Sequence, residues 1–130
     1  MTQKSFIPFG GEAIQAGELE AARVVVLPIY YEMAPSFGSG AGEGPYHLLN
    51  ASFELECLDE ETLVDWRQLG IHTVPGVCPT QDPEKAVEEI EAAAGRYLGG
   101  DRFLFSVGGD HAITIGLSRA VASRYPDLGV

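Results

Sequence analysis

The stretch at residues 103–114 constrains the fold most, because it joins a short apolar run to a helical segment through a tight turn. The run at 103–107, Phe-Leu-Phe-Ser-Val, has the composition of a strand buried on both faces of a sheet. Two glycines end the run, Asp110 and His111 follow, and apolar residues recur at helical spacing over 115–125. A buried strand that leads directly into a helix is typical of an open parallel sheet, where ligands bind at the strand ends.

The rest of the chain alternates strands and helices in the same way. Val24, Val25 and Val26 lie in an unbroken apolar run, which predicts a central parallel strand. Pro45 and Pro83 stand where the first turn of a helix is expected, a position that favours proline. We therefore expect a parallel sheet with helices on both faces, its strands at 22–30, 70–77 and 102–107 and its helices at 46–56, 83–97 and 114–125.

A glycine-rich segment at 32–44 leaves the end of the first expected strand. A phosphate-binding loop would need a lysine after its last glycine, or a Gly-x-Gly-x-x-Gly pattern that opens into a helix. This segment has alternating glycines, no lysine, and Glu43, whose charge would repel a phosphate. The sequence therefore argues against a nucleotide site here and predicts a long, flexible loop.

The composition describes one acidic globular domain. The chain has 130 residues and a hydrophobic fraction of 45%, and its 8 Lys and Arg against 19 Asp and Glu give a net charge of −11. Such a charge repels phosphate backbones and anionic membranes, so we expect neither nucleic acid nor a membrane as a partner. It would attract a cationic substrate at long range, although solubility alone also accounts for an acidic surface.

The remaining sequence signals concern the cellular compartment. Cys57 and Cys78 have no paired metal-binding spacing and fit a reducing compartment as free thiols. Residues 1–12 lack the apolar core of a signal peptide, and no apolar run is long enough to span a bilayer. We therefore expect a cytoplasmic protein.

Several residues of metal-binding type are given no role. The acidic cluster at 54–61 matches no calcium-binding spacing and is expected to be a solvated helix end. His47 and His72 have no second ligand three or four residues away, so we expect them to be surface or packing residues. No catalytic and no cofactor-binding residue is identified.

Asp110 and His111 allow two interpretations. In one, Asp110 caps the following helix and His111 is an ordinary polar residue in a loop. In the other, His111 presents a neutral ring nitrogen to a metal ion. Spacing alone favours the first interpretation, because Gly-Gly-Asp-His offers only one candidate ligand.

The longer string around this pair resembles a known motif. Residues 106–114, Ser-Val-Gly-Gly-Asp-His-Ala-Ile-Thr, closely resemble the first metal-ligand motif of the ureohydrolase family of arginases, agmatinases and formiminoglutamases. A second block is similar to the family's first strand, loop and helix, and comprises residues 24–32, Gly40, 44–45 and 51–52. Ala112 departs from the Ser usual in the family, and 113–114 look most like the agmatinase branch. The resemblance implies an α/β fold of three αβα layers, the N-terminal part of a mostly parallel arginase-like sheet.

The resemblance also implies a metal and a division of the chain. His111 would be a ligand to one of two Mn²⁺ ions that activate a bridging hydroxide. The family's other ligands belong to Asp-x-His-x-Asp and Asp-x-Asp motifs, which this sequence lacks. We therefore expect an N-terminal arm at 1–20 and the N-terminal portion of an arginase-like domain at 21–130, truncated before the later metal motifs. The isolated chain would hold at most one partial metal site and be inactive.

The expected activity of the parent protein is hydrolysis of a small cationic guanidino substrate, agmatine, to putrescine and urea. Arginase and formiminoglutamase activities stay open as alternatives, as does a non-catalytic module that associates through its open sheet edge. An incomplete sheet leaves apolar surface bare, so a homo-oligomer is expected.

Overall fold

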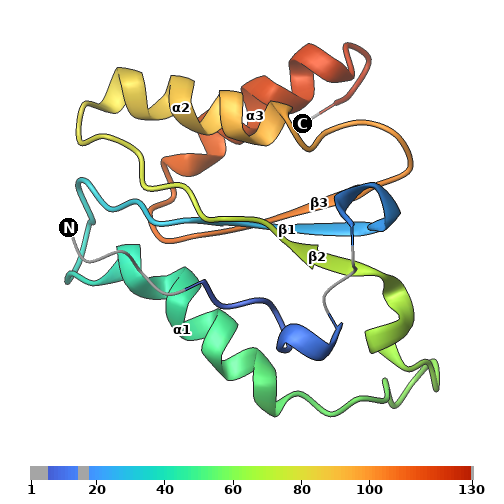
Figure 1. The fold of residues 1–130 in the computed structure, drawn as a ribbon. Helices are drawn as coiled ribbons and strands as arrows, with labels where there is room; N and C mark the ends of the chain where they lie inside the picture. Colours follow the sequence, from blue (N-terminus) through green and yellow to red (C-terminus); the bar gives the residue numbers. More distant parts are fainter. Residues whose placement is uncertain (1–5, 15–17, 130) are drawn as a thin grey trace.

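A parallel sheet of three strands forms the centre of the computed structural model, which describes residues 6–14 and 18–129. The strands lie in the order β2-β1-β3, at Ile71–Thr73, Val24–Ile29 and Phe103–Gly108. Because all three run in the same direction, their carboxyl ends meet at one edge of the sheet (Figure 1). This edge is where a parallel α/β fold presents its ligand-binding residues.

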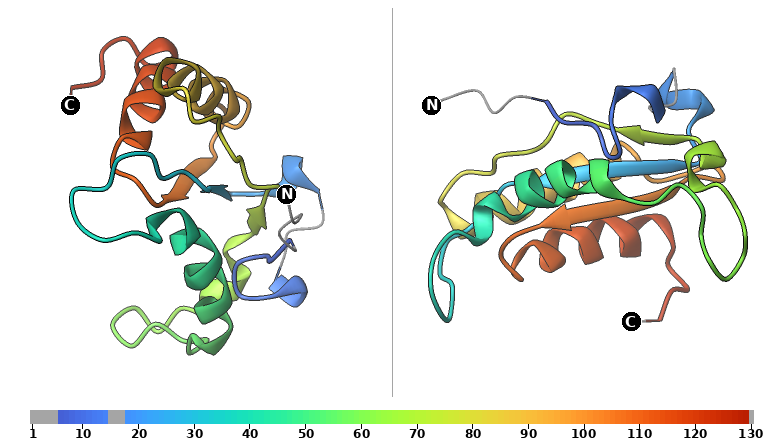
Figure 2. Two further views of the ribbon diagram at one scale, coloured as in Figure 1. Left: turned by 90° about the vertical axis from the view of Figure 1, so that its left-hand side faces the viewer. Right: turned by 90° about the horizontal axis from the view of Figure 1, so that it is seen from below.

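Three α-helices cover the two faces of the sheet. Helix α1 (Gly44–Ala51) lies on one face, while α2 (Pro83–Gly95) and α3 (Ile113–Arg124) pack side by side on the other (Figures 1 and 2). Five short 3-10 helices complete the elements, at Glu12–Ile14, Leu19–Ala21, Ala41–Glu43, Ser52–Glu54 and Trp66–Leu69. The expected three-layer αβα fold is confirmed.

Local signals determine where the elements begin. The Asp82 carboxylate accepts hydrogen bonds from the backbone N–H groups of Glu84 and Lys85, at 3.1 and 3.3 Å, and so caps α2. Pro45 lies in the first turn of α1, as predicted. The second strand is shorter than the predicted 70–77, since only an isolated bridge from Ile29 to Val77 continues the pairing.

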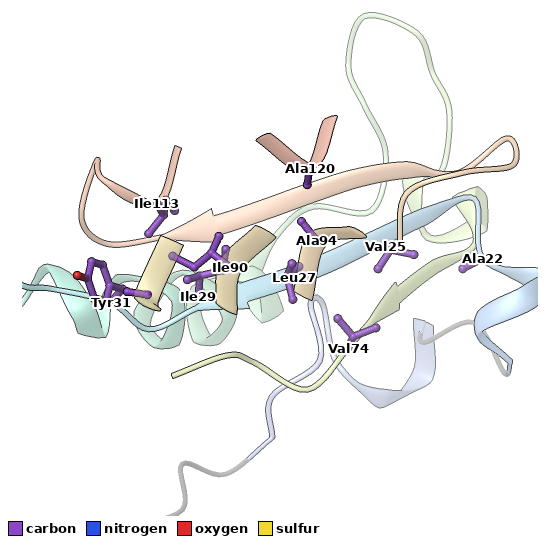
Figure 3. Close-up of a cluster of buried hydrophobic side chains, with 11 residues drawn as sticks. Ala22, Val25, Leu27, Ile29, Tyr31, Val74, Ile90, Ala94, Ile113 and Ala120 are labelled. Carbon is purple, nitrogen blue, oxygen red and sulfur yellow. The ribbon is translucent and has the colours of Figure 1, made fainter. Parts of the chain in front are cut away.

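The main core lies between the sheet and the pair α2–α3. Val25, Leu27 and Ile29 of β1 all point into it and have no exposed surface. Figure 3 shows these side chains together with Ile90 and Ala94 of α2. The β-branched and leucine side chains of β1 therefore supply the centre of the hydrophobic core, as expected for a central strand.

The prediction that residues 103–107 are buried on both faces is wrong. In the described part of the chain β3 is an edge strand, paired only with β1. Leu104 packs against the α2–α3 core and Val107 is buried on the other face, but Phe103 and Phe105 are 64% and 43% exposed. Helix α1 has only eight residues and covers the Val107 end of β3, so the rest of this face lacks a cover.

The segment at 6–14 packs on the α1 face of the sheet. The backbone N–H of Phe9 donates to the Thr73 hydroxyl at 2.9 Å, and that of Gly10 donates to the Ser52 hydroxyl at 2.8 Å. Of the predicted arm at 1–20, residues 1–5 and 15–17 lie outside the described residues.

Candidate functional site

The candidate site lies where β1 and β3 end side by side. Ile29 is in register with Gly108, so both strands stop at the same level of the sheet. Each is followed by a loop, 30–43 after β1 and 109–112 after β3, and the left view of Figure 2 looks onto this edge. The two segments that carry the family resemblance are therefore neighbours in space.

Asp110 joins the two loops through hydrogen bonds to backbone N–H groups. Its Oδ1 accepts from the N–H of Ala112 at 2.9 Å, and its Oδ2 accepts from Met33 and Ala34 at 3.2 and 3.4 Å. The backbone N–H of Asp110 in turn donates to the Tyr31 carbonyl at 3.0 Å. These bonds stabilise the ionised form and hold the pKa of the Asp110 carboxyl below its ordinary value, with the Ala112 bond the largest cause.

The bonds of Asp110 bear on the two interpretations of the Asp-His pair. Asp110 binds the N–H of Ala112, which immediately precedes α3, but the helix itself begins without a side-chain cap, so the capping role is met only in the turn before it. Sequence reasoning missed the second role, the connection to residues 33 and 34, more than seventy positions away in the chain. Only the parallel pairing of β1 with β3 brings those amides within reach.

Gly109 allows the loops to approach this closely. A Cβ at position 109 would lie 2.0 Å from the Ala41 carbonyl oxygen and 2.8 Å from the Gly42 nitrogen. Both are backbone atoms that cannot move aside as a flexible side chain would. Glycine is therefore required at this position by close packing of backbones rather than by a special φ angle.

His111 is exposed, directly after the turn and before α3. Its backbone carbonyl accepts from Thr114 N–H at 3.1 Å, so the start of α3 fixes its main chain while its ring reaches solvent. The imidazole thus stands at the carboxyl edge of β3, the position that a metal ligand in a parallel α/β fold would occupy.

The described residues do not complete a metal site around His111. Among them, no three His, Cys, Asp or Glu side chains come close enough together to hold an ion. Asp110 is the nearest carboxylate in sequence, and both of its oxygens already accept backbone hydrogen bonds. The fit to a dinuclear manganese centre is therefore limited to one imidazole.

The residues of metal-binding type that were given no role from the sequence lie on other elements. His47 is exposed on α1 and its ring meets the Tyr46 ring edge-on, while His72 lies within β2. The acidic cluster at 54–61 follows α1, and Asp59 in it accepts from the Thr62 hydroxyl and N–H at 2.7 Å. Among the described residues, none of these groups forms a cluster of three possible metal ligands with His111.

A separate hollow of about 490 Å³ lies near the opposite ends of the strands. Its walls come from the segment at 6–14, the 3-10 helix that follows α1 and the 3-10 helix before β2, with side chains that include Ile14, Phe53 and Trp66. Arg67 at its rim is engaged by Asp65, whose carboxylate lies 2.6 Å from the guanidinium. The hollow is thus distinct from the strand edge that carries His111.

The fold is that of a parallel α/β protein with an exposed histidine directly after one of its strand ends. The model of the arginase family matches residues 22–130, so the chain belongs to the arginase family. It is 38% identical over 114 residues to an N(1)-aminopropylagmatine ureohydrolase of Thermus thermophilus, covering 85% of this chain and 38% of that protein. It is also 26% identical over 115 residues to an agmatinase of Bacillus cereus, covering 85% of this chain and 39% of the relative.

A solved structure shows the same fold. The agmatine ureohydrolase of Thermoplasma volcanium superposes with a TM-score of 0.78 at 22% identity, covering 89% of this chain and 39% of that one. The chain therefore spans less than two fifths of the length of the relatives named here. In the part of the chain that the structure describes, no helix is both long and apolar enough to cross a bilayer.

Proposed function

We propose that the protein to which this chain belongs hydrolyses the guanidino group of agmatine to putrescine and urea, with manganese as its cofactor. The proposal depends chiefly on one observation: an exposed imidazole, His111, at the carboxyl edge of β3 in a chain of the arginase family. Relatives with ureohydrolase and agmatinase names support the reaction class. The excess of acidic residues is compatible with a cationic substrate.

His111 would hold one of two manganese ions, whose role when bound is to lower the pKa of a water molecule and so supply the nucleophile. Because the described residues offer one imidazole and no carboxylate set beside it, no catalytic step is assigned to them. We propose that the remaining ligands lie outside residues 1–130, in the family's two later motifs. Residues 1–130 alone would then be inactive.

N(1)-aminopropylagmatine is a second candidate substrate. Identity to the Thermus relative that bears this name is 38%, against 26% to the Bacillus agmatinase. Both substrates end in the same guanidino group, so His111 would have the same role with either. Neither relative is an arginase or a formiminoglutamase.

The oligomeric state and the cellular location of the protein are also proposed, each from a surface or side-chain feature. The uncovered face at Phe103 and Phe105 supports association of copies of the chain, and the free Cys57 and Cys78 support a cytoplasmic location. Light scattering of a Phe105→Ser variant tests the first, because loss of an exposed ring should reduce the associated mass.

The experiment that tests the function uses the complete protein and a matched pair of histidine variants. We expect His111→Ala to lower manganese-dependent urea release by about 100-fold or more, since loss of a direct ligand exceeds the 10–100-fold cost of losing an outer partner. His47→Ala, which removes another exposed imidazole, should leave the rate unchanged. Equal rates for the parent and His111→Ala, with agmatine, N(1)-aminopropylagmatine and arginine each tested, would refute the assignment.

A further inference from the structure

Loop 33–43 wraps around a carboxylate from its own chain. The Glu32 Oε2 accepts from the backbone N–H of Gly40 at 2.9 Å and from that of Gly42 at 2.8 Å, and Oε1 accepts from Gly40 at 3.0 Å. Successive backbone N–H groups that converge on one point form an anion-binding concavity. Here the anion is supplied internally, three residues after β1 ends.

The glycines fit this arrangement closely. Gly40 has a φ of 106°, a backbone conformation that other residues rarely adopt. A Cβ at Gly42 would lie 3.3 Å from the Glu32 Cβ, so the loop backbone packs directly against the end of β1. The alternating glycines, which lack the pattern of a phosphate loop, are thus used to enclose Glu32.

The same loop is attached to the His111 turn at two further points. Asp110 Oδ2 binds the N–H groups of Met33 and Ala34 at the start of the loop, and Gly109 packs on the backbone of Ala41 near its end. The bonds of Glu32 to Gly40 and Gly42 add a third attachment, at the end of the loop. The sequence did not predict these three sets of contacts, and the flexibility of the loop stays a prediction.

We propose that Glu32 is a positioning residue, whose carboxylate fills the concavity formed by Gly40 and Gly42 and thereby holds loop 33–43 as a fixed wall beside His111. Because backbone N–H groups bound to a charged acceptor make stronger bonds than those bound to a neutral one, the wall depends on the charge as well as on the size of Glu32. The effect on turnover rests on the proposed function. The effect on the loop does not.

Hydrogen exchange measured by mass spectrometry tests the positioning of the loop without reference to activity. In the complete protein, Glu32→Ala should speed exchange of the amides at 33–43 by about tenfold or more, while exchange in α2 stays as in the parent. Glu88→Gln, an exposed charge change on α2, is the matched control and should change neither. Unchanged exchange at 33–43 in Glu32→Ala, or an equal rise throughout the chain, would overturn the proposal.

Chemical rescue with a small anion distinguishes the effect of the Glu32 charge on the loop from the effect of the volume of its side chain. Added formate should enter the concavity vacated in Glu32→Ala and restore slow exchange at 33–43, whereas chloride at the same ionic strength should not. Glu32→Gln fills the concavity with a neutral amide, so its exchange should be intermediate and indifferent to formate. Failure of formate to act on Glu32→Ala, or an equal response of Glu32→Gln, would contradict an anion-filled concavity.

Turnover supplies the last readout. With the complete enzyme, Glu32→Ala should raise KM for the guanidino substrate more than it lowers kcat, because under the proposed function loop 33–43 would border the substrate beside His111 while the metal ligands stay in place. Formate should reverse the change in KM. A fall in kcat at constant KM would overturn the role as a substrate-side wall, while absence of activity in the parent protein would refute the proposed function and leave the exchange result standing.

Discussion

The two faces of the sheet are built by different means. The α2–α3 face is closed by apolar side chains, with Val25, Leu27 and Ile29 wholly buried under two helices. The α1 face has a short helix, a smaller cluster, and two exposed rings on β3. The difference teaches that one parallel sheet can have a complete core on one face and a partial one on the other.

Polar contacts make up part of the difference on the α1 face. The Ser52 hydroxyl donates to the Leu49 carbonyl and accepts from Gly10, and the Thr73 hydroxyl accepts from Phe9. Both hydroxyl residues are buried, at 4% and 1% exposure. On this face, hydrogen bonds therefore help to attach the segment at 6–14 to the sheet layer. On the other face, apolar contacts attach α2 and α3.

The largest expected effect contrasts one side chain from each face. Leu27→Ala should lower the free energy of unfolding by about 3 kcal/mol, because it leaves a cavity in a fully packed core. Phe105→Ala should cost about 1 kcal/mol or less, since much of the ring is already exposed. Urea denaturation of the two variants measures both values, and equal losses would remove the distinction between the faces.

Helix packing on the closed face predicts the next effect. A Cβ at Gly116 of α3 would lie 2.7 Å from the Val87 carbonyl oxygen and 2.8 Å from the Ile90 Cβ of α2. We expect Gly116→Ala to destabilise the chain by about 1–2 kcal/mol, because overpacking exceeds the gain in helix propensity.

Gly95→Ala is the matched control for the helix contact. A Cβ at Gly95, at the end of α2, meets nothing within 4 Å. This variant should be neutral or stabilising by up to about 1 kcal/mol, as measured by thermal unfolding. A stabilising Gly116→Ala would show that α2 and α3 are less closely packed than the structure has them.

A smaller effect is expected for the polar anchor on the α1 face. Ser52→Ala leaves the Gly10 N–H without its acceptor and should cost about 1 kcal/mol. Hydrogen exchange should rise in the segment at 6–14 and stay constant in α2–α3. An equal rise in hydrogen exchange in the segment at 6–14 and in α2–α3 would instead mean that the two faces of the sheet are not stabilised independently.

The smallest effect concerns pH and an exposed contact beyond α1. Hydrogen bonds from the Thr62 hydroxyl and N–H lower the pKa of the Asp59 carboxyl below its ordinary value of 3.8. A lowered folded-state pKa gives stability that is present above the unfolded value and lost as the pH falls through the folded one. Asp59→Asn should therefore lower stability slightly at pH 7 and have no such effect at pH 2, by parallel urea titrations.

The strand-helix alternation and the place of His111 were predictable from local patterns. Unbroken β-branched runs, prolines in first turns and the Gly-Gly-Asp-His string each act over a few residues. The role of Glu32 left a weaker signal, an acidic residue just after a strand with glycines eight and ten positions later. That spacing alone does not predict that the Glu32 carboxylate accepts hydrogen bonds from the loop backbone.

The sequence by itself determined which segments become strands and helices, and which histidine stands at a strand end, because propensity and periodicity are local properties of the chain. Tertiary structure alone decided that β3 is half exposed, since burial depends on which elements come to lie on each side. It also decided that Asp110 and Glu32 bind the loop after β1, because hydrogen bonds between distant segments form only once parallel pairing has aligned the strand ends.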